Sequence, residues 1–179
     1  MTEPLRPSPA LTLGRENWYY VPAGGFADYL NPTALELSAT SVLDFTRMAM
    51  ADGTTKPSRS TDRTESNRRL GDVDTFEVKG VTKYAGGTLT YATDPQAIAG
   101  TDGKKAWEQF LDGPNDGFIV CRYKVDRSIA PTVGQFVSVF PSDLSESLLT
   151  TAGSGSATEV VGECDYFIRE AIKQMVALA

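Results

Sequence analysis

The chain has 179 residues, of which 41% are hydrophobic, and it carries a formal net charge of −6 with a pI near 4.7. This length suits one domain or one domain with arms, and the hydrophobic share is enough for a core, which excludes a fully disordered chain. The acidic balance argues against tight binding to a nucleic acid backbone. No apolar run approaches the roughly 18 residues of a membrane span, and residues 1–10 contain no secretory h-region. We therefore expect no membrane association and no secretion.

The sequence contains no histidine and has two cysteines, Cys121 and Cys164. Histidine is the commonest general base and metal ligand, so its absence lowers the expectation of catalysis and leaves no Cys/His zinc site. Both cysteines lie in apolar strand-like runs, which predicts small buried thiols. We expect no enzymatic activity, no bound metal and no cofactor.

Residues 1–32 contain five of the ten prolines and are interpreted as a Pro-rich N-terminal arm. Proline removes a backbone donor, so this segment is not expected at the centre of a sheet. The adjacent Trp18, Tyr19 and Tyr20 have two equally supported interpretations. They cap the edge of their own domain, or they are arm contacts that dock on a neighbouring subunit.

The main β domain is expected over residues 33–179. Within "TALELSAT", residues 33–40, Leu35, Leu37 and Ala39 alternate with polar residues. This period of two predicts a half-buried strand.

A long polar loop is predicted at residues 41–72. Between residues 47 and 70 it carries three acidic and six basic side chains, leaving −9 on the rest of the chain; the basic residues are Arg47, Lys56, Arg59, Arg63, Arg68 and Arg69. A structureless loop of this length in a compact domain is usually functional or disordered. A basic loop on an acidic body is complementary to other copies of the same chain, in a head-to-tail contact that builds rings or filaments.

Strands are predicted again from residue 73. "VDTFEVKGV" and "KYAGGTLTYATD" are interpreted as a hairpin that turns around Gly80 to Thr82.

The stretch 101–113 predicts a short helix, with Thr101 or Asp102 as its N-cap and Gly113 before Pro114 as its stop. Its apolar face consists of Trp107, Phe110 and Leu111. A helix of about three turns is unstable alone and must lie on a sheet. We therefore expect these three residues at a helix–sheet flank.

The rest of the chain predicts further strands at residues 117–126, 134–143 and 159–167, with a small-residue flexible loop at 150–158. In the last of these strands, Glu159, Glu163 and Asp165 alternate with the apolar set, as a solvated or pore-facing row would. Residues 168–179 fit a helix by periodicity, although a strand stays open. The fold class is mainly β with one short helix.

This pattern of elements resembles the tail tube proteins, or major tail proteins, of long-tailed bacteriophages. The resemblance is carried by "TFEVKGVTKYAGGTLTYATDPQA", "GKKAWEQFLDG", "GFIVCRYKVD" and "GQFVSVFPSD", and it covers roughly residues 33–167. It implies a β-sandwich or barrel-like domain with a helix at its flank and a C-terminal strand.

The resemblance further implies that subunits join in hexameric rings, whose inner sheets merge into one barrel, and that rings stack into a tube. DNA and the tape-measure protein pass through such a tube, and tail-tip and tail-terminator proteins bind its ends. In this family the loop after the first strand and the terminal arms reach the adjacent ring, which points to residues 41–72 as an inter-ring contact loop. Glu159, Glu163 and Asp165 would then be lumen acids. The expected location is the virion, after assembly in the host cytoplasm, and we expect a long non-contractile tail.

Three alternatives stay open at this point. One is the tube of a type VI secretion or other contractile injection apparatus, and another is a monomeric β-sandwich binding module with Trp18 to Tyr20 as its platform. The third is a carboxylate-dependent hydrolase, for which Glu163 with Asp165 would be tested first.

Overall fold

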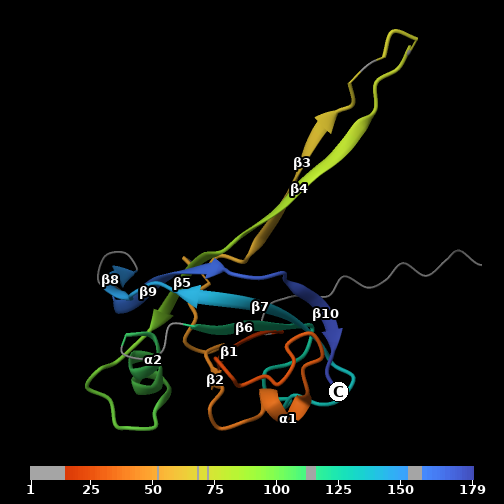
Figure 1. The fold of residues 1–179 in the computed structure, drawn as a ribbon. Coiled ribbons are helices and arrows are strands. Elements are labelled where there is room, and N and C mark those ends of the chain that lie inside the picture. The colour runs from red at the N-terminus through yellow and green to blue at the C-terminus, as the bar shows by residue number, and fades with distance from the viewer. Residues whose placement is uncertain (1–14, 52, 68, 72, 112–115, 153–158) are drawn as a thin grey trace, which may run out of the picture.

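The computed structural model describes residues 15–51, 53–67, 69–71, 73–111, 116–152 and 159–179. These residues form a rounded body from which a long two-stranded hairpin projects (Figure 1). The body contains one antiparallel sheet. Six of its strands follow one another in the order β2 (Leu43–Asp44), β1 (Glu16–Pro22), β6 (Asp116–Tyr123), β7 (Phe136–Leu144), β9 (Glu159–Ile168) and β5 (Gly87–Ala92).

Two further strands complete this sheet. β8 (Leu148–Ala152) pairs with β9, and β10 (Lys173–Ala177) pairs with β7. β7 therefore bonds β6 along one edge and shares its other edge between β9 and β10. This divided edge lets the sheet curl, so that β5 and β9 come to lie over β1 and β6.

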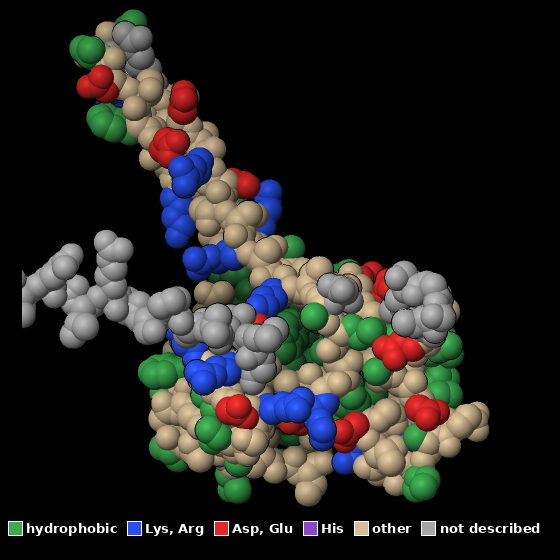
Figure 2. Space-filling view, turned by 180° about the vertical axis from the view of Figure 1, so that it is seen from behind, with side chains coloured by type: hydrophobic (Ala, Val, Ile, Leu, Met, Phe, Trp, Pro, Cys, Tyr) green, Lys and Arg blue, Asp and Glu red, His purple; other side chains and the backbone are tan. Residues whose placement is uncertain are grey.

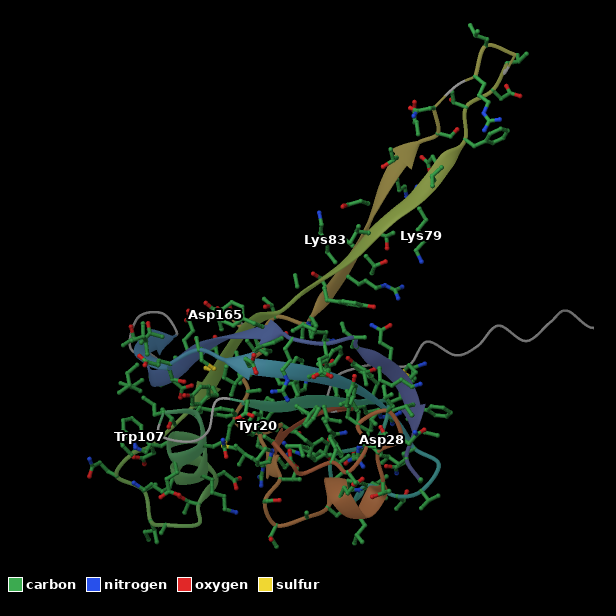
Figure 3. The ribbon with its side chains drawn as sticks, in the orientation of Figure 1. Tyr20, Asp28, Lys79, Lys83, Trp107 and Asp165 are labelled. Carbon is green, nitrogen blue, oxygen red and sulfur yellow. The ribbon has the colours of Figure 1, made fainter. Side chains whose placement is uncertain are left out.

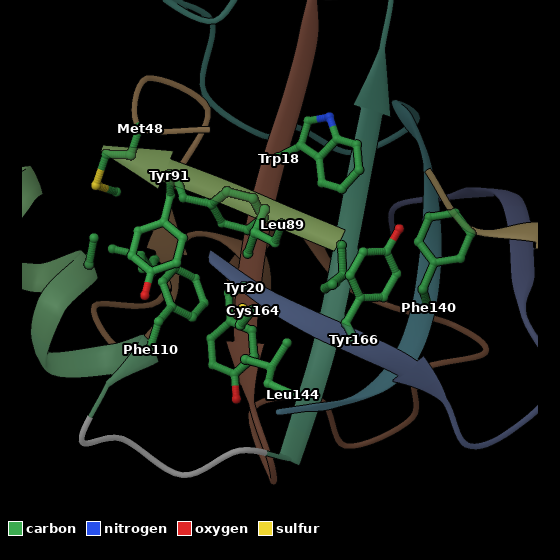
Figure 4. Packing of buried hydrophobic residues seen from close by; sticks show 14 of the residues in the cluster. Trp18, Tyr20, Met48, Leu89, Tyr91, Phe110, Phe140, Leu144, Cys164 and Tyr166 are labelled. Atoms are coloured by element: carbon green, nitrogen blue, oxygen red, sulfur yellow. The ribbon is translucent and has the colours of Figure 1, made fainter. Parts of the chain in front are cut away.

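The space inside the curl is filled by the larger of two core clusters. Figure 4 shows Tyr20 from β1, Tyr91 from β5 and Cys164 from β9 converging with Phe110. Phe110 lies on α2 (Asp102–Phe110), and its ring centroid is 5.6 Å from that of Tyr20 and 4.7 Å from that of Tyr91. The helix thus closes one end of the curled sheet with an aromatic side chain.

The second cluster lies on the opposite face of β1, β6 and β7. It contains Tyr19, Val120 and Val139, and it is covered by residues 23–42 and the C-terminal Leu178. β6 is therefore buried on both faces, which explains its nearly continuous apolar sequence.

β1 corrects the prediction of an N-terminal arm over residues 1–32. It pairs with β6 from Glu16 to Pro22, and its aromatic side chains are at most 6% exposed. The prediction that Trp18, Tyr19 and Tyr20 contact a neighbouring subunit is wrong, because their rings are buried in the chain's own two clusters. Pro22 does not prevent the pairing of β1 with β6, since it is the last residue of the strand. Residues 1–14 lie outside the described part of the chain.

The strand predicted at 33–40 is instead a single helical turn, α1 (Ala34–Leu37). Thr33 accepts a hydrogen bond from the N–H of Glu36 at 3.1 Å, and the Glu36 carboxylate accepts one from the N–H of Thr33 at 2.8 Å. This reciprocal capping box stabilises the turn, and the T-x-x-E spacing that encodes it was present in the sequence.

The hairpin predicted around Gly80 to Thr82 is also wrong. Residues 77–85 form one continuous strand, β4 (Glu77–Ala85), whose partner is β3 (Ser58–Glu65) from the segment predicted as a structureless loop. The chain then passes through Gly86 into β5, which belongs to the body.

The remaining elements largely follow prediction. α2, β6, β7 and β9 are confirmed, and both cysteines are buried as free thiols. Burial raises the pKa of the Cys164 thiol to about 11, so it stays protonated at neutral pH. The helix favoured for residues 168–179 is wrong, because β10 occupies that segment. Residues 150–152 belong to β8, and residues 153–158 of the predicted flexible loop are not described.

Candidate assembly interface

The projecting hairpin is the feature that the body does not explain. All eight residues of β3 are exposed, and none of the described residues of β3 or β4 belongs to either core cluster. A two-stranded ribbon without a third strand or a packed face is at best marginally stable in water. Both faces of the hairpin are therefore largely exposed.

Charge dominates the stem of this hairpin. The register places Arg63 opposite Lys79 and Glu65 opposite Glu77, so like charges face each other across the two strands. Arg63 pairs diagonally with Glu77 at 3.3 Å, and Lys83 pairs with Asp62 at 2.9 Å. These ion pairs are largely exposed and each contributes at most about 1 kcal/mol.

The root of the hairpin, in contrast, is fixed to the body. The N–H of Thr55 donates to the carbonyl of Thr88 at 2.8 Å, and the Tyr166 hydroxyl donates to the carbonyl of Thr55 at 2.5 Å. On the other strand, Gly86 passes so close to β9 that a Cβ there would lie 1.6 Å from the Tyr166 carbonyl oxygen. Lys56 and Glu16 add an ion pair of 2.8 Å. These contacts therefore fix the base of the hairpin to the sheet, while the strands beyond the base are exposed.

The basic residues that were predicted to form one contact set do not all lie together in the structure. Arg59 and Arg63 lie on β3, Arg69 lies near the end of the hairpin, and Lys56 lies at its root. Arg47 lies apart from them, in an exposed turn of the body, and Arg68 lies outside the described residues.

Two basic residues of the hairpin were missed by the sequence analysis. Lys79 and Lys83 project from β4, as Figure 3 shows. They were assigned to a different hairpin because the break at Gly80 was interpreted as a turn. Residues 56–85, which run from the root of the hairpin to the end of β4, hold seven basic and five acidic residues, a net charge of +2. The rest of the chain carries −8.

The three predicted lumen acids lie on one face of β9. All three are exposed; Glu163 and Asp165 alternate with the buried Cys164 and Tyr166, whereas the buried Val161 separates Glu159 from them. Asp165 accepts a hydrogen bond from the Thr88 hydroxyl of β5 at 3.0 Å. Glu163 and Asp165 therefore lie on the face of β9 opposite Cys164 and Tyr166, which belong to the first core cluster.

The predicted helix flank is unevenly buried. Phe110 is 2% exposed and Trp107 and Leu111 are half-buried, while Ala106 completes the buried face one turn before Phe110. The Ser147 hydroxyl, which accepts a hydrogen bond from Tyr91 at 2.8 Å, donates to the carbonyl of Phe110 at 2.7 Å. This bond ties the end of the helix to the turn that precedes β8.

Within the described residues, no group of three or more His, Cys, Asp or Glu side chains is placed to hold a metal ion. No helix among them is both long and apolar enough to cross a membrane.

The described residues thus form a β body with an exposed two-stranded hairpin attached to it. A model of the phage tail tube protein family matches residues 4–158, which is most of the chain. The chain therefore belongs to the phage tail tube protein family, and it is a structural component of a phage tail rather than an enzyme.

The other comparisons concern the fold. A chain in the cryo-EM structure of the anti-feeding prophage (AFP) baseplate, 6-fold symmetrised, is similar with a TM-score of 0.51 and 10% identity, over 96% of this chain and 98% of that chain. At this identity the likeness shows the fold alone. No curated protein matches the chain.

Proposed function

We propose that this chain assembles into hexameric rings that stack as a phage tail tube, the conduit for DNA during ejection. The observation that carries the proposal is the mounted hairpin, since an exposed ribbon of this length requires a partner to be stably ordered. The family match supports a tail role, and the 6-fold symmetry stated for the similar baseplate structure supports six subunits in a ring.

Sheet edges support ring formation. β8 pairs with β9 along one edge only, and its described side chains, Leu148 to Thr151, are exposed. An open edge strand with exposed apolar residues is prone to pair with another chain, and closure of a ring of subunits removes such edges. In the proposed ring, the edge at β8 meets a sheet edge of the neighbouring subunit.

Electrostatics support the role of a conduit. DNA passes without binding when the wall is acidic, because phosphate contacts from basic groups would hold it. The exposed row of Glu159, Glu163 and Asp165 is the surface proposed to face the lumen. The tape-measure protein would occupy the same lumen before ejection, and tail-tip and tail-terminator proteins would bind the two ends. The tube would belong to the virion and be assembled in the host cytoplasm.

The tube of a contractile injection apparatus is the second candidate, favoured by the similar anti-feeding prophage structure. The match of the phage tail tube family model over residues 4–158 favours the phage tube over it. The two differ in whether a sheath surrounds the tube, so co-purification of a sheath protein with native tubes would decide for the contractile apparatus.

Electron microscopy of the purified protein over a concentration series, at low and high salt, tests the proposal. We expect rings and hollow tubes, with shorter tubes at high salt because exposed charge contacts are screened. A chain that stays monomeric throughout, and also in the presence of a tail-tip complex, would contradict the proposal.

A further inference from the structure

The end of the hairpin differs chemically from its stem. Residues 66–76 carry two basic and two acidic residues and are neutral overall. Leu70 is fully exposed, Val73 is 89% exposed and Phe76 is 70% exposed. We call the described residues of this segment, 66–67, 69–71 and 73–76, the tip. Figure 2 shows hydrophobic side chains near the end of the hairpin, with most of the Lys and Arg side chains gathered along the stem.

Three large apolar side chains exposed within seven residues of a neutral tip mark a contact site, because monomeric proteins rarely expose contiguous apolar patches. The basic stem can steer and orient a partner, whereas affinity comes mainly from buried apolar anchors. The partner must therefore offer an apolar recess for the tip with an acidic surround for the stem.

If the partner is a second copy of the chain, the direction of stacking limits which side of the subunit can carry this recess. A head-to-tail contact joins two different surfaces, and repeated stacking along one axis needs them on opposite sides of the subunit. In Figure 1 the hairpin rises from the side of the body that carries β5 and β9, and α2 and the turn before β2 lie on the other side.

A hollow of about 440 Å³ lies on that far side, between residues 40–44 and α2. Its apolar part comes from Val42 and Leu43, and Thr40, Ser41 and Gln109 also line it. Three carboxylates and one ammonium group surround it, namely Asp44, Asp102, Glu108 and Lys105. The hollow therefore combines an apolar recess with a net negative rim, opposite in sign to the hairpin.

We propose that the tip of one subunit inserts into the hollow between α2 and residues 40–44 of a second copy. Phe76 and Leu70 are the apolar anchors, and the basic stem lies against the carboxylates of the rim. This inference rests on the stacking of subunits proposed above and specifies which two surfaces meet in it.

Site-directed crosslinking tests this pairing directly. Both native thiols are buried, Cys121 at 0% and Cys164 at 2% exposure, so introduced cysteines will be the reactive ones. Phe76→Cys protein is mixed with Ser41→Cys protein, assembled under reducing conditions, checked by electron microscopy and then oxidised. Leu70→Cys provides a second tip position in case loss of the Phe76 ring prevents assembly.

The expected result is a disulfide-linked dimer of the two variants within tubes. The matched control replaces Ser41→Cys by Val133→Cys, at an exposed position in the loop before β7. A disulfide requires Cα atoms within about 7 Å, so we expect the tip to crosslink to residue 41 about ten times more than to residue 133.

Two other outcomes separate the inference from the function on which it rests. Tubes in which both tip positions crosslink to residue 41 no more than to residue 133 would overturn the inference and leave the tube function standing. An absence of rings, tubes and crosslinks for all variants and for the unmodified chain would overturn both.

Discussion

At the residue scale, Glu36 holds the first turn of α1 to the segment before it. Its carboxylate accepts hydrogen bonds of 2.8 Å from the N–H of Ala27, from the N–H of Thr33 and from the Thr33 hydroxyl. Burial by itself would raise the pKa of Glu36, but these bonds outweigh it and leave the pKa below its ordinary value. The ionised carboxylate therefore stabilises the folded state.

The sign of the pH dependence follows from this lowered pKa. The contribution of Glu36 is fully present above about pH 4.5, its pKa in the unfolded chain, and it is lost as the pH falls through the lower pKa of the folded state. We expect Glu36→Gln to lower the free energy of unfolding by about 1 kcal/mol at pH 7 and by much less near pH 3. Denaturant unfolding at the two pH values measures the difference.

Glu108→Gln, on the exposed part of α2, is the matched control. It should change the free energy of unfolding by a similar small amount at both pH values. An equal cost of Glu36→Gln at pH 7 and pH 3 would show that the charge of Glu36 does not stabilise the turn.

At the element scale, the proposed function gives the charges of the hairpin stem a role in assembly and none in folding. Arg59 and Arg63 both lie on exposed β3, and the pair of Arg63 with Glu77 contributes little because both side chains are more than 60% exposed. Replacing them removes charge from the hairpin without opening a cavity in either core cluster.

We expect the variant with Arg59→Ser, Arg63→Ser, Arg68→Ser and Arg69→Ser to fold and to fail to stack. The reduced variant with Arg59→Ser and Arg63→Ser should raise the concentration needed for tube formation about tenfold, which corresponds to about 1.4 kcal/mol of contact energy. Sedimentation of tubes over a concentration series measures this threshold, and circular dichroism checks the fold.

A charge-matched control is available in the body. Arg15→Ser with Arg127→Ser removes the same charge from two exposed positions that are not part of the hairpin. If it raises the threshold as much as the hairpin variant does, net charge rather than the hairpin controls stacking. Tubes of normal length from the fourfold hairpin variant would exclude an electrostatic role for this element.

At the scale of the whole molecule, the core clusters and the hairpin proposed for assembly lie in separate parts of the chain. Both core clusters lie in the body, and the described residues of β3 and β4 contribute to neither. The two strands begin and end side by side, since Ser58 is paired with Ala85. The hairpin can therefore be removed without separating the body strands that it connects.

Replacing residues 58–83 by a short Gly-Ser turn should leave a folded, soluble body that forms no tubes. The thermal midpoint should change by only a few degrees, because a 1 kcal/mol change shifts the midpoint of a domain of this size by about 2–4 °C. Thermal unfolding followed by circular dichroism measures the body, and electron microscopy measures assembly. A body that unfolds after the excision would show that the hairpin stabilises it; normal tubes would remove the hairpin from the proposed mechanism.

A helix or strand can be predicted from the sequence alone when one of its faces is buried. α2 was predicted because Phe110 and its neighbours recur at helical spacing, and β6, β7 and β9 because their apolar residues mark buried strands. β3 was missed because both of its faces are exposed, so burial imposes no alternation on "SRSTDRTE". α1 was missed because four residues are too few to distinguish a period of two from one helical turn.

Composition and local pattern by themselves determined an acidic, mainly β chain with one short aromatic helix, a basic polar segment and no histidine. Tertiary structure alone decided that Trp18, Tyr19 and Tyr20 belong to the core, that residues 58–65 pair with 77–85, and that the C-terminal segment joins β7 as a strand. The physical reason is that hydrophobic periodicity records which face of a segment is buried, whereas the partner that buries it lies far along the chain. Pairing is selected by the packing of the whole body, which no local window contains.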